Sequence, residues 1–169
     1  MNAIFRFALI VSLSAASCVA QTGSVTFYSQ RLTPKSEATM FLPKSQQPFE
    51  GWLFDGPQRL ARLNHGRLAT FKLKPGIHSF TVTGPTGPGK RPLVINVEDG
   101  GQYCVRLFAK VINVGVYGRW ENQIKGVPCH GAQGEAAHLK PVEMKRVDPA
   151  TRAEFDPATT FQAESPPQR

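Results

Sequence analysis

The chain has 169 residues, and its 20 lysines and arginines against 12 acidic residues give a formal net charge of +8. The basic residues are scattered, and the lack of a run of five or more argues against a nucleic-acid-binding arm. The positive charge favours anionic neighbours such as phospholipid headgroups, lipopolysaccharide or acidic glycan. A solvated basic surface is the simpler explanation of the same composition.

Residues 1–20 have the order of a secretory signal. Arg6 precedes an apolar run over residues 7–13, and small residues follow as far as Ala20. The run is much shorter than the roughly 20 residues that span a bilayer, so an uncleaved anchor is the weaker interpretation. Lipid attachment at Cys18 is an alternative, because small residues precede it, although the usual lipobox leucine is missing. We therefore expect export to the periplasm or cell surface, with or without a lipid anchor, and no transmembrane segment in the mature chain.

From residue 24 to residue 147, short apolar segments are separated by Gly, Pro, Asn and Asp, which is typical of an antiparallel β domain. The first strands are expected at residues 24–28, 38–42, 51–54 and 58–63. Val25 and Phe27 share one face of the first strand. The glycine-containing turns at residues 55–56 and 64–66 predict hairpins with a positive φ.

The middle of the chain alternates most clearly. Residues 67–73 predict a strand with Ala69, Phe71 and Leu73 facing the core and with Thr70 and Lys72 facing water. Further strands are expected at residues 77–83, 93–98 and 102–110, separated by turns at 74–76 and 99–101 and by a Gly/Pro loop. That loop matches the G-x-x-x-x-G-K part of a phosphate-binding motif, but the hydroxyl and the helix that the motif needs do not follow, so we expect a loose hairpin loop.

The pattern weakens after residue 110. No period is evident over residues 111–117, a short helix is predicted over residues 132–139, and a closing strand is predicted over residues 142–147. The expected organisation is a signal peptide at 1–20, one domain at 21–147 and a disordered Pro-rich tail at 148–169. The fold class is all-β, mainly an antiparallel β-sandwich, with one short C-terminal helix.

Cys104 and Cys129 are expected to form a disulfide, because two thiols in an exported domain usually pair. The bridge would close a loop of about 25 residues and stabilise the fold by roughly 3 to 4 kcal/mol. A zinc site that recruits His130 or His138 is the alternative, but Cys104 stands alone and no C-x-x-C pattern occurs. We expect no metal and no cofactor.

No catalytic motif stands out. The sequence contains neither G-x-S-x-G nor H-E-x-x-H, and its four histidines lie far apart in sequence. Aromatic residues give the best hint of recognition, since Trp52, Tyr117 and Trp120 would form a binding surface for sugars or an apolar partner if they lay together. Packing in the core explains these three residues nearly as well.

Three short segments carry a family resemblance: Phe-Asp-Gly at residues 54–56, Lys-Pro-Gly-Ile-His at 74–78 and Gly-Gln-Tyr-Cys-Val at 101–105. With them the chain resembles the bacterial DUF2846 domain, and PEGA-type surface modules share the Pro-Gly-x-His element. The similarity covers residues 25–147. It implies an exported β-sandwich of uncharacterised function, often with a signal or lipobox, and it transfers no catalytic or binding residue.

We therefore expect a non-enzymatic envelope module that presents loops and a basic surface to a protein, glycan or anionic lipid partner. Two alternatives stay open. One is a hydrolase-type enzyme whose site is assembled from residues distant in sequence, and the other is a lipid-tethered accessory protein.

Overall fold

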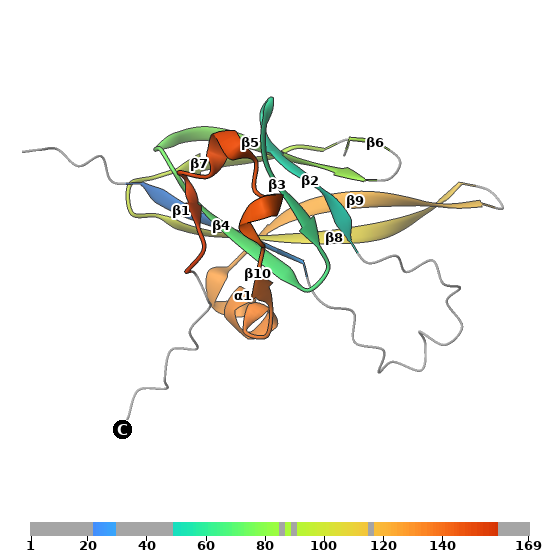
Figure 1. Ribbon diagram of the computed structural model, residues 1–169. Helices are drawn as coiled ribbons and strands as arrows, with labels where there is room; N and C mark the ends of the chain where they lie inside the picture. The colour runs from blue at the N-terminus through green and yellow to red at the C-terminus, as the bar shows by residue number, and fades with distance from the viewer. Residues whose placement is uncertain (1–21, 30–48, 85–86, 89–90, 115–116, 159–169) are drawn as a thin grey trace, which may run out of the picture.

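The computed structural model describes residues 22–29, 49–84, 87–88, 91–114 and 117–158, and it confirms the expected β-sandwich with one short helix (Figure 1). One sheet, called sheet A, has the strand order β10-β4-β1-β8-β9, with β11 also paired to β4. The other, sheet B, has the order β3-β2-β5-β6, with β7 also paired to β5. The strands are β1 (Gly23–Ser29), β2 (Glu50–Asp55), β3 (Gln58–Asn64), β4 (Arg67–Leu73), β5 (Gly76–Gly84), β6 (Gly87–Pro88), β7 (Leu93–Val97), β8 (Gln102–Val114), β9 (Tyr117–Val127), β10 (Lys140–Pro141) and β11 (Phe155–Asp156).

The core lies between the two sheets and follows the predicted alternation. In sheet A, β1 pairs antiparallel with β4 and parallel with β8, so that Val25 faces Phe71 and Phe27 faces Ala69 in register. All four side chains are fully buried. The ring of Phe27 lies 4.9 Å from that of Phe80 on β5 of sheet B, in an edge-to-face arrangement that joins the two layers.

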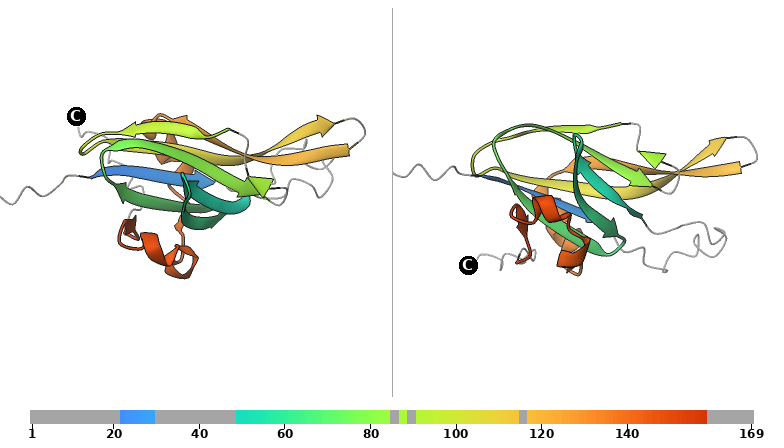
Figure 2. Two further views of the ribbon diagram at one scale, coloured as in Figure 1. Left: turned by 90° about the horizontal axis from the view of Figure 1, so that it is seen from above. Right: turned by 45° about the horizontal axis from the view of Figure 1, so that its top comes forward.

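Strand β9 was not predicted, and it forms a long hairpin with β8. The pairing is continuous from Cys104 opposite Val127 to Val114 opposite Tyr117. Figure 2 shows the far end of this hairpin projecting beyond the sandwich. The middle of the hairpin is fixed to sheet B by Asn122, whose Nδ2 donates to the carbonyl oxygens of Glu50 at 3.1 Å and Thr83 at 2.9 Å.

Two predicted turns have different outcomes. The turn at residues 55–56 joins β2 and β3 as a hairpin, with Gly56 at φ 50°, as expected. Gly66 also has a positive φ of 72°, but this turn carries the chain from β3 in sheet B to β4 in sheet A. The hairpin predicted at residues 64–66 is therefore wrong, because each strand finds its hydrogen-bonding partners in a different sheet.

Helix α1 (Cys129–Ala136) covers part of the outer face of sheet A. Ala132 and Ala136 of the helix pack against Tyr28 and Leu68 of the sheet. The helix was predicted over residues 132–139 and begins earlier. Thr70 of β4 is only 1% exposed, and its Oγ1 lies 2.9 Å from that of Thr26, so the expectation that Thr70 faces water is wrong.

The C-terminal segment differs most from expectation. Residues 142–147 contain the 3-10 helix η2 (Met144–Arg146) instead of a strand, because Val142 and Val147 are buried while the residues between them turn outward. Residues 148–158 are ordered. They contain the 3-10 helix η3 (Pro149–Thr151) and strand β11, and Phe155 packs on Phe71 with ring centroids 5.6 Å apart. This part of the tail prediction is wrong.

The signal peptide and the strand expected at residues 38–42 lie outside the described residues, as do residues 159–169 of the tail. Among the helices that the structure describes, none combines the length and apolar character needed to span a membrane.

Candidate functional site

The predicted disulfide joins Cys104 on β8 to Cys129, the first residue of α1, with the two Cα atoms 5.1 Å apart. Both sulfurs are used in the bridge, so neither is a thiolate ligand for zinc. Over the described ranges, no group of three or more His, Cys, Asp or Glu side chains is arranged to hold a metal ion. The bridge is compatible with an oxidising compartment.

A hollow of about 410 Å³ lies beside the disulfide, where β9 ends close to β7. Among the described residues that line it, none is charged. Its lining consists of Ile95, Gln102, Tyr103, Cys104, Gly126, Val127, Pro128 and Cys129.

The three aromatic residues proposed as a binding surface come from two sheets. Trp52 lies on β2 in sheet B and is half-buried, next to the fully buried Leu53. Tyr117 and Trp120 lie on β9 in sheet A, opposite Val114 and Val111, and their side chains are outside what the structure describes. A common surface formed by all three therefore stays a prediction.

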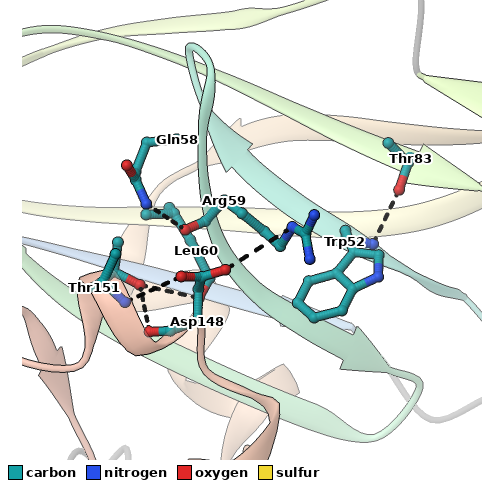
Figure 3. Close-up of polar contacts among 8 residues, drawn as sticks. Trp52, Gln58, Arg59, Leu60, Thr83, Asp148 and Thr151 are labelled. Carbon is teal, nitrogen blue, oxygen red and sulfur yellow. Dashed lines mark hydrogen bonds and ion pairs between the residues drawn. The ribbon is translucent and has the colours of Figure 1, made fainter.

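Arg59 is the residue that sequence analysis did not connect to Trp52. Its guanidinium carbon lies 4.6 Å from the centre of the indole ring, within the range of a cation–π contact (Figure 3). A bulge brings the two together. Leu53 pairs with Ala61 and Phe54 pairs with Arg59, so Leu60 is an extra residue in β3. Leu60 is buried, and the displaced register leaves Arg59 beside Trp52.

Asp148 in the C-terminal segment also contacts the guanidinium group of Arg59. Asp148 places Oδ2 3.9 Å from the Arg59 Nε, and its backbone N–H donates to the Leu60 carbonyl at 2.8 Å (Figure 3). Its Oδ1 accepts from the backbone N–H of Ala150 at the start of η3. The carboxylate is thus fixed by backbone contacts, whereas the Arg59 side chain stays 51% exposed.

A second arginine and two aliphatic residues extend this face. Arg62 pairs in register with Trp52, is 49% exposed, and contacts Glu50 at 2.8 Å. Ile77 on β5 and Val94 on β7 are 79% and 59% exposed. Both alternate with core residues of their strands, which places them on the outer side of the sheet. We call the set Trp52, Arg59, Arg62, Ile77 and Val94 the outer face of sheet B.

The structure also brings two segments of the family resemblance into contact. His78 Nδ1 lies 2.5 Å from Asp55 Oδ2, and the Asp55 Oδ1 accepts from the backbone N–H of Ser79 at 3.1 Å. The Nε2 of His78 lies 2.9 Å from the Lys74 carbonyl oxygen, and the imidazole stacks on Phe80. Asp55 belongs to the Asp-Gly turn and His78 to the Pro-Gly-x-His turn. The two segments thus form a clasp, made by Asp55 and His78, between β2 and β5.

Both ring nitrogens of His78 face hydrogen-bond acceptors, so both hydrogen bonds form only when both nitrogens carry a proton. Desolvation lowers the pKa of His78. The hydrogen bonds to Asp55 and the Lys74 carbonyl, with the charges of Asp55 and Glu154, outweigh this effect and raise the pKa above its ordinary value. In this state the imidazole has no free lone pair to act as a base or to bind a metal. The geometry favours a structural role for the pair. The remaining histidines, His65, His130 and His138, are exposed.

Comparisons of the chain with protein-family models, with curated proteins and with solved structures found no match. The resemblance to DUF2846 therefore stays a hypothesis that rests on the three segments quoted above.

Proposed function

We propose that the chain is an exported, non-enzymatic binding module of the cell envelope that binds an anionic glycan on the outer face of sheet B. The observation that carries the proposal is the contact between Arg59 and Trp52, in which a half-exposed guanidinium lies over an indole ring beside a second half-exposed arginine. The proposed family resemblance supports the same general role.

The chemistry of this face suits a sugar that carries acidic groups. A rigid indole offers a large contact area at low entropic cost. Guanidinium groups bind carboxylate, phosphate or sulfate oxygens through two parallel N–H donors. Glu50 and Asp148 partly neutralise the two arginines, so we expect an anionic ligand to compete with these carboxylates. This competition predicts weak to moderate affinity that falls with salt concentration.

Export is supported by the order of residues 1–20 and by the compatible disulfide. Mass spectrometry of the protein from its native envelope tests this part. A chain that begins at Gln21 supports a released module, and an acylated Cys18 supports the lipid-tethered form. An intact chain that begins at Met1 in the cytosol would contradict both.

Calorimetric titration with polygalacturonic acid, and with neutral dextran as the reference polymer, tests the binding site. We expect binding of the acidic polymer only, with loss of most of the affinity in Trp52→Ala and Arg59→Ala. Lys140→Ala is the matched control, because Lys140 is an exposed cation on sheet A. Equal losses in Arg59→Ala and Lys140→Ala would show non-specific charge attraction and would contradict the proposed site. Binding to anionic vesicles or an envelope protein, but not to the polymer, would replace the glycan with that partner.

A further inference from the structure

The C-terminal segment covers two strand edges on one side of the sandwich. β10 and β11 both pair with β4 at the edge of sheet A. At the edge of sheet B, Val147 forms a bridge to Ala61 and the Asp148 N–H donates to the Leu60 carbonyl. Open edges are templates for pairing with other chains, and folded proteins commonly protect them in this way.

Strand β9 forms the opposite edge of sheet A and has a different environment. Within the described part of the chain it pairs with β8 alone. It runs for eleven residues, contains no proline, and keeps an unbroken register with β8. Half of its backbone N–H and C=O groups point away from β8, as they do in any strand paired on one side. An edge of this length and unbroken register offers hydrogen-bonding groups to an incoming strand along the whole of β9.

We infer that β9 pairs with β9 of a second copy of this chain, in antiparallel orientation, to form a twofold-symmetric dimer. The inference is independent of the proposed glycan binding. Residues directly opposite each other in an antiparallel pair point to the same side of the sheet, so one residue of β9 must lie opposite the same residue of the copy, with the twofold axis between them. The charges on β9 then decide which residue lies opposite its own copy.

A pairing centred on Gln123 sets Glu121 opposite Lys125 of the copy, and the symmetry repeats this contact. Both residues lie on the same side of β9 as Gln123, and their own neighbours on β8 are Lys110 and Arg106. Glu121 is half-buried and Lys125 is exposed. A pairing centred on Asn122 instead sets Arg119 opposite Lys125. Opposite charges across strands stabilise a sheet and like charges destabilise it, so the Gln123 register is favoured.

Charge reversal tests the dimer directly. Sedimentation velocity of the purified protein is expected to show a concentration-dependent dimer. Glu121→Lys and Lys125→Glu each place two like-charged pairs in the interface, and each should raise the dimer dissociation constant by about tenfold. The double variant E121K/K125E restores both opposite-charge pairs and should return the constant towards that of the original protein. Lys140→Glu is the control, and it should leave the constant unchanged.

A protein that is monomeric up to its solubility limit would overturn the inference. So would a double variant that dimerises as weakly as the two single variants, because that result would show that the two charges do not face each other. Circular dichroism and thermal melting of each variant verify that the monomer is folded. Since Lys125 is exposed, its reversal should preserve the fold even if Glu121→Lys does not.

Discussion

Asp55 and His78, which are 23 positions apart in sequence, join β2 to β5 in sheet B. Asp55 ends β2, and His78 lies near the start of β5. One carboxylate oxygen holds the imidazole, and the other holds the backbone N–H of Ser79. Since the imidazole also faces the Lys74 carbonyl, the clasp joins β2, β5 and the turn before β5. This gives a physical reason for the Asp-Gly and Pro-Gly-x-His segments that requires no catalytic function.

The clasp predicts a specific dependence of stability on pH. Because the folded pKa of His78 is raised, its contribution is fully present below the unfolded pKa of about 6.5 and is lost as pH rises through the folded pKa. Urea denaturation across this range should show stability decreasing with pH, and His78→Gln should remove most of that slope. The exposed His65, changed to Gln, is the control. An unchanged slope in His78→Gln would contradict a protonated clasp.

Arg59 illustrates a second contact that depends on a single backbone irregularity. Without the bulge, β3 would continue the register of Leu53 with Ala61, and the next pair of β2 and β3 would be Phe54 with Leu60. The bulge buries Leu60 and Ala61 together and shifts Arg59 to the position opposite Phe54. The composition of the outer face of sheet B therefore follows from the bulge as well as from the residue types.

At the scale of elements, α1 depends on its covalent attachment. It has eight residues, contains Gly131 and Gly134, and has no side-chain cap at its N-terminus. Such a short helix has little stability of its own. Burial of Ala132 and Ala136, the hydrogen bond from the Tyr28 hydroxyl to Glu135 at 2.8 Å, and the Cys104–Cys129 bridge hold it on sheet A.

Removing the bridge with Cys104→Ala and Cys129→Ala should lower the free energy of unfolding by roughly 3 to 4 kcal/mol, because the loop it closes is no longer restrained in the unfolded chain. Denaturant titration measures this loss. Hydrogen exchange should show the α1 amides opening before those of β1. The original protein under reducing conditions is the matched control and should behave like the double variant. Equal stability of the double variant and the oxidised protein would contradict this role of the bridge.

Strands with an alternating buried face could be predicted from sequence, whereas β9 at the edge of sheet A could not. β4 and β8 alternate because Ala69, Phe71, Val105 and Leu107 face the core. In β9 only Ile124 packs against the core among the described residues 121–126, so no alternation marks the strand. Its conformation is determined by pairing with β8, which is a tertiary effect.

The C-terminal segment and the candidate sites were missed for related reasons. Residues 148–158 contain one large apolar anchor, Phe155, within a composition typical of disorder. The contacts of His78 with Asp55 and of Arg59 with Trp52 arise from strand pairing and from a bulge, and neither is visible in residue spacing. The disulfide could be predicted because the domain offers only one pair of cysteines.

At the scale of the whole molecule, the two sheets are protected unequally. The C-terminal segment covers the edges of β4 and β3, whereas the outer edge of β9 has no partner strand among the described residues. This asymmetry directs association to one side of the sandwich. Residues 148–158 therefore contribute to stability and solubility, because they prevent the edges of β4 and β3 from pairing with strands of other chains.

A chain that ends at Val147 should therefore be both less stable and more prone to aggregate. It loses Phe155 from its contact with Phe71, which alone should cost about 3 kcal/mol, and it exposes the edge of β4 along β11. Thermal melting and static light scattering measure the two effects. A chain that ends at Ala158 is the matched control, since it retains every described contact of this segment. Equal melting temperatures and equal light scattering of the two chains would show that residues 148–158 do not protect the edges of β4 and β3. That result would contradict the proposed difference between these edges and the edge of β9.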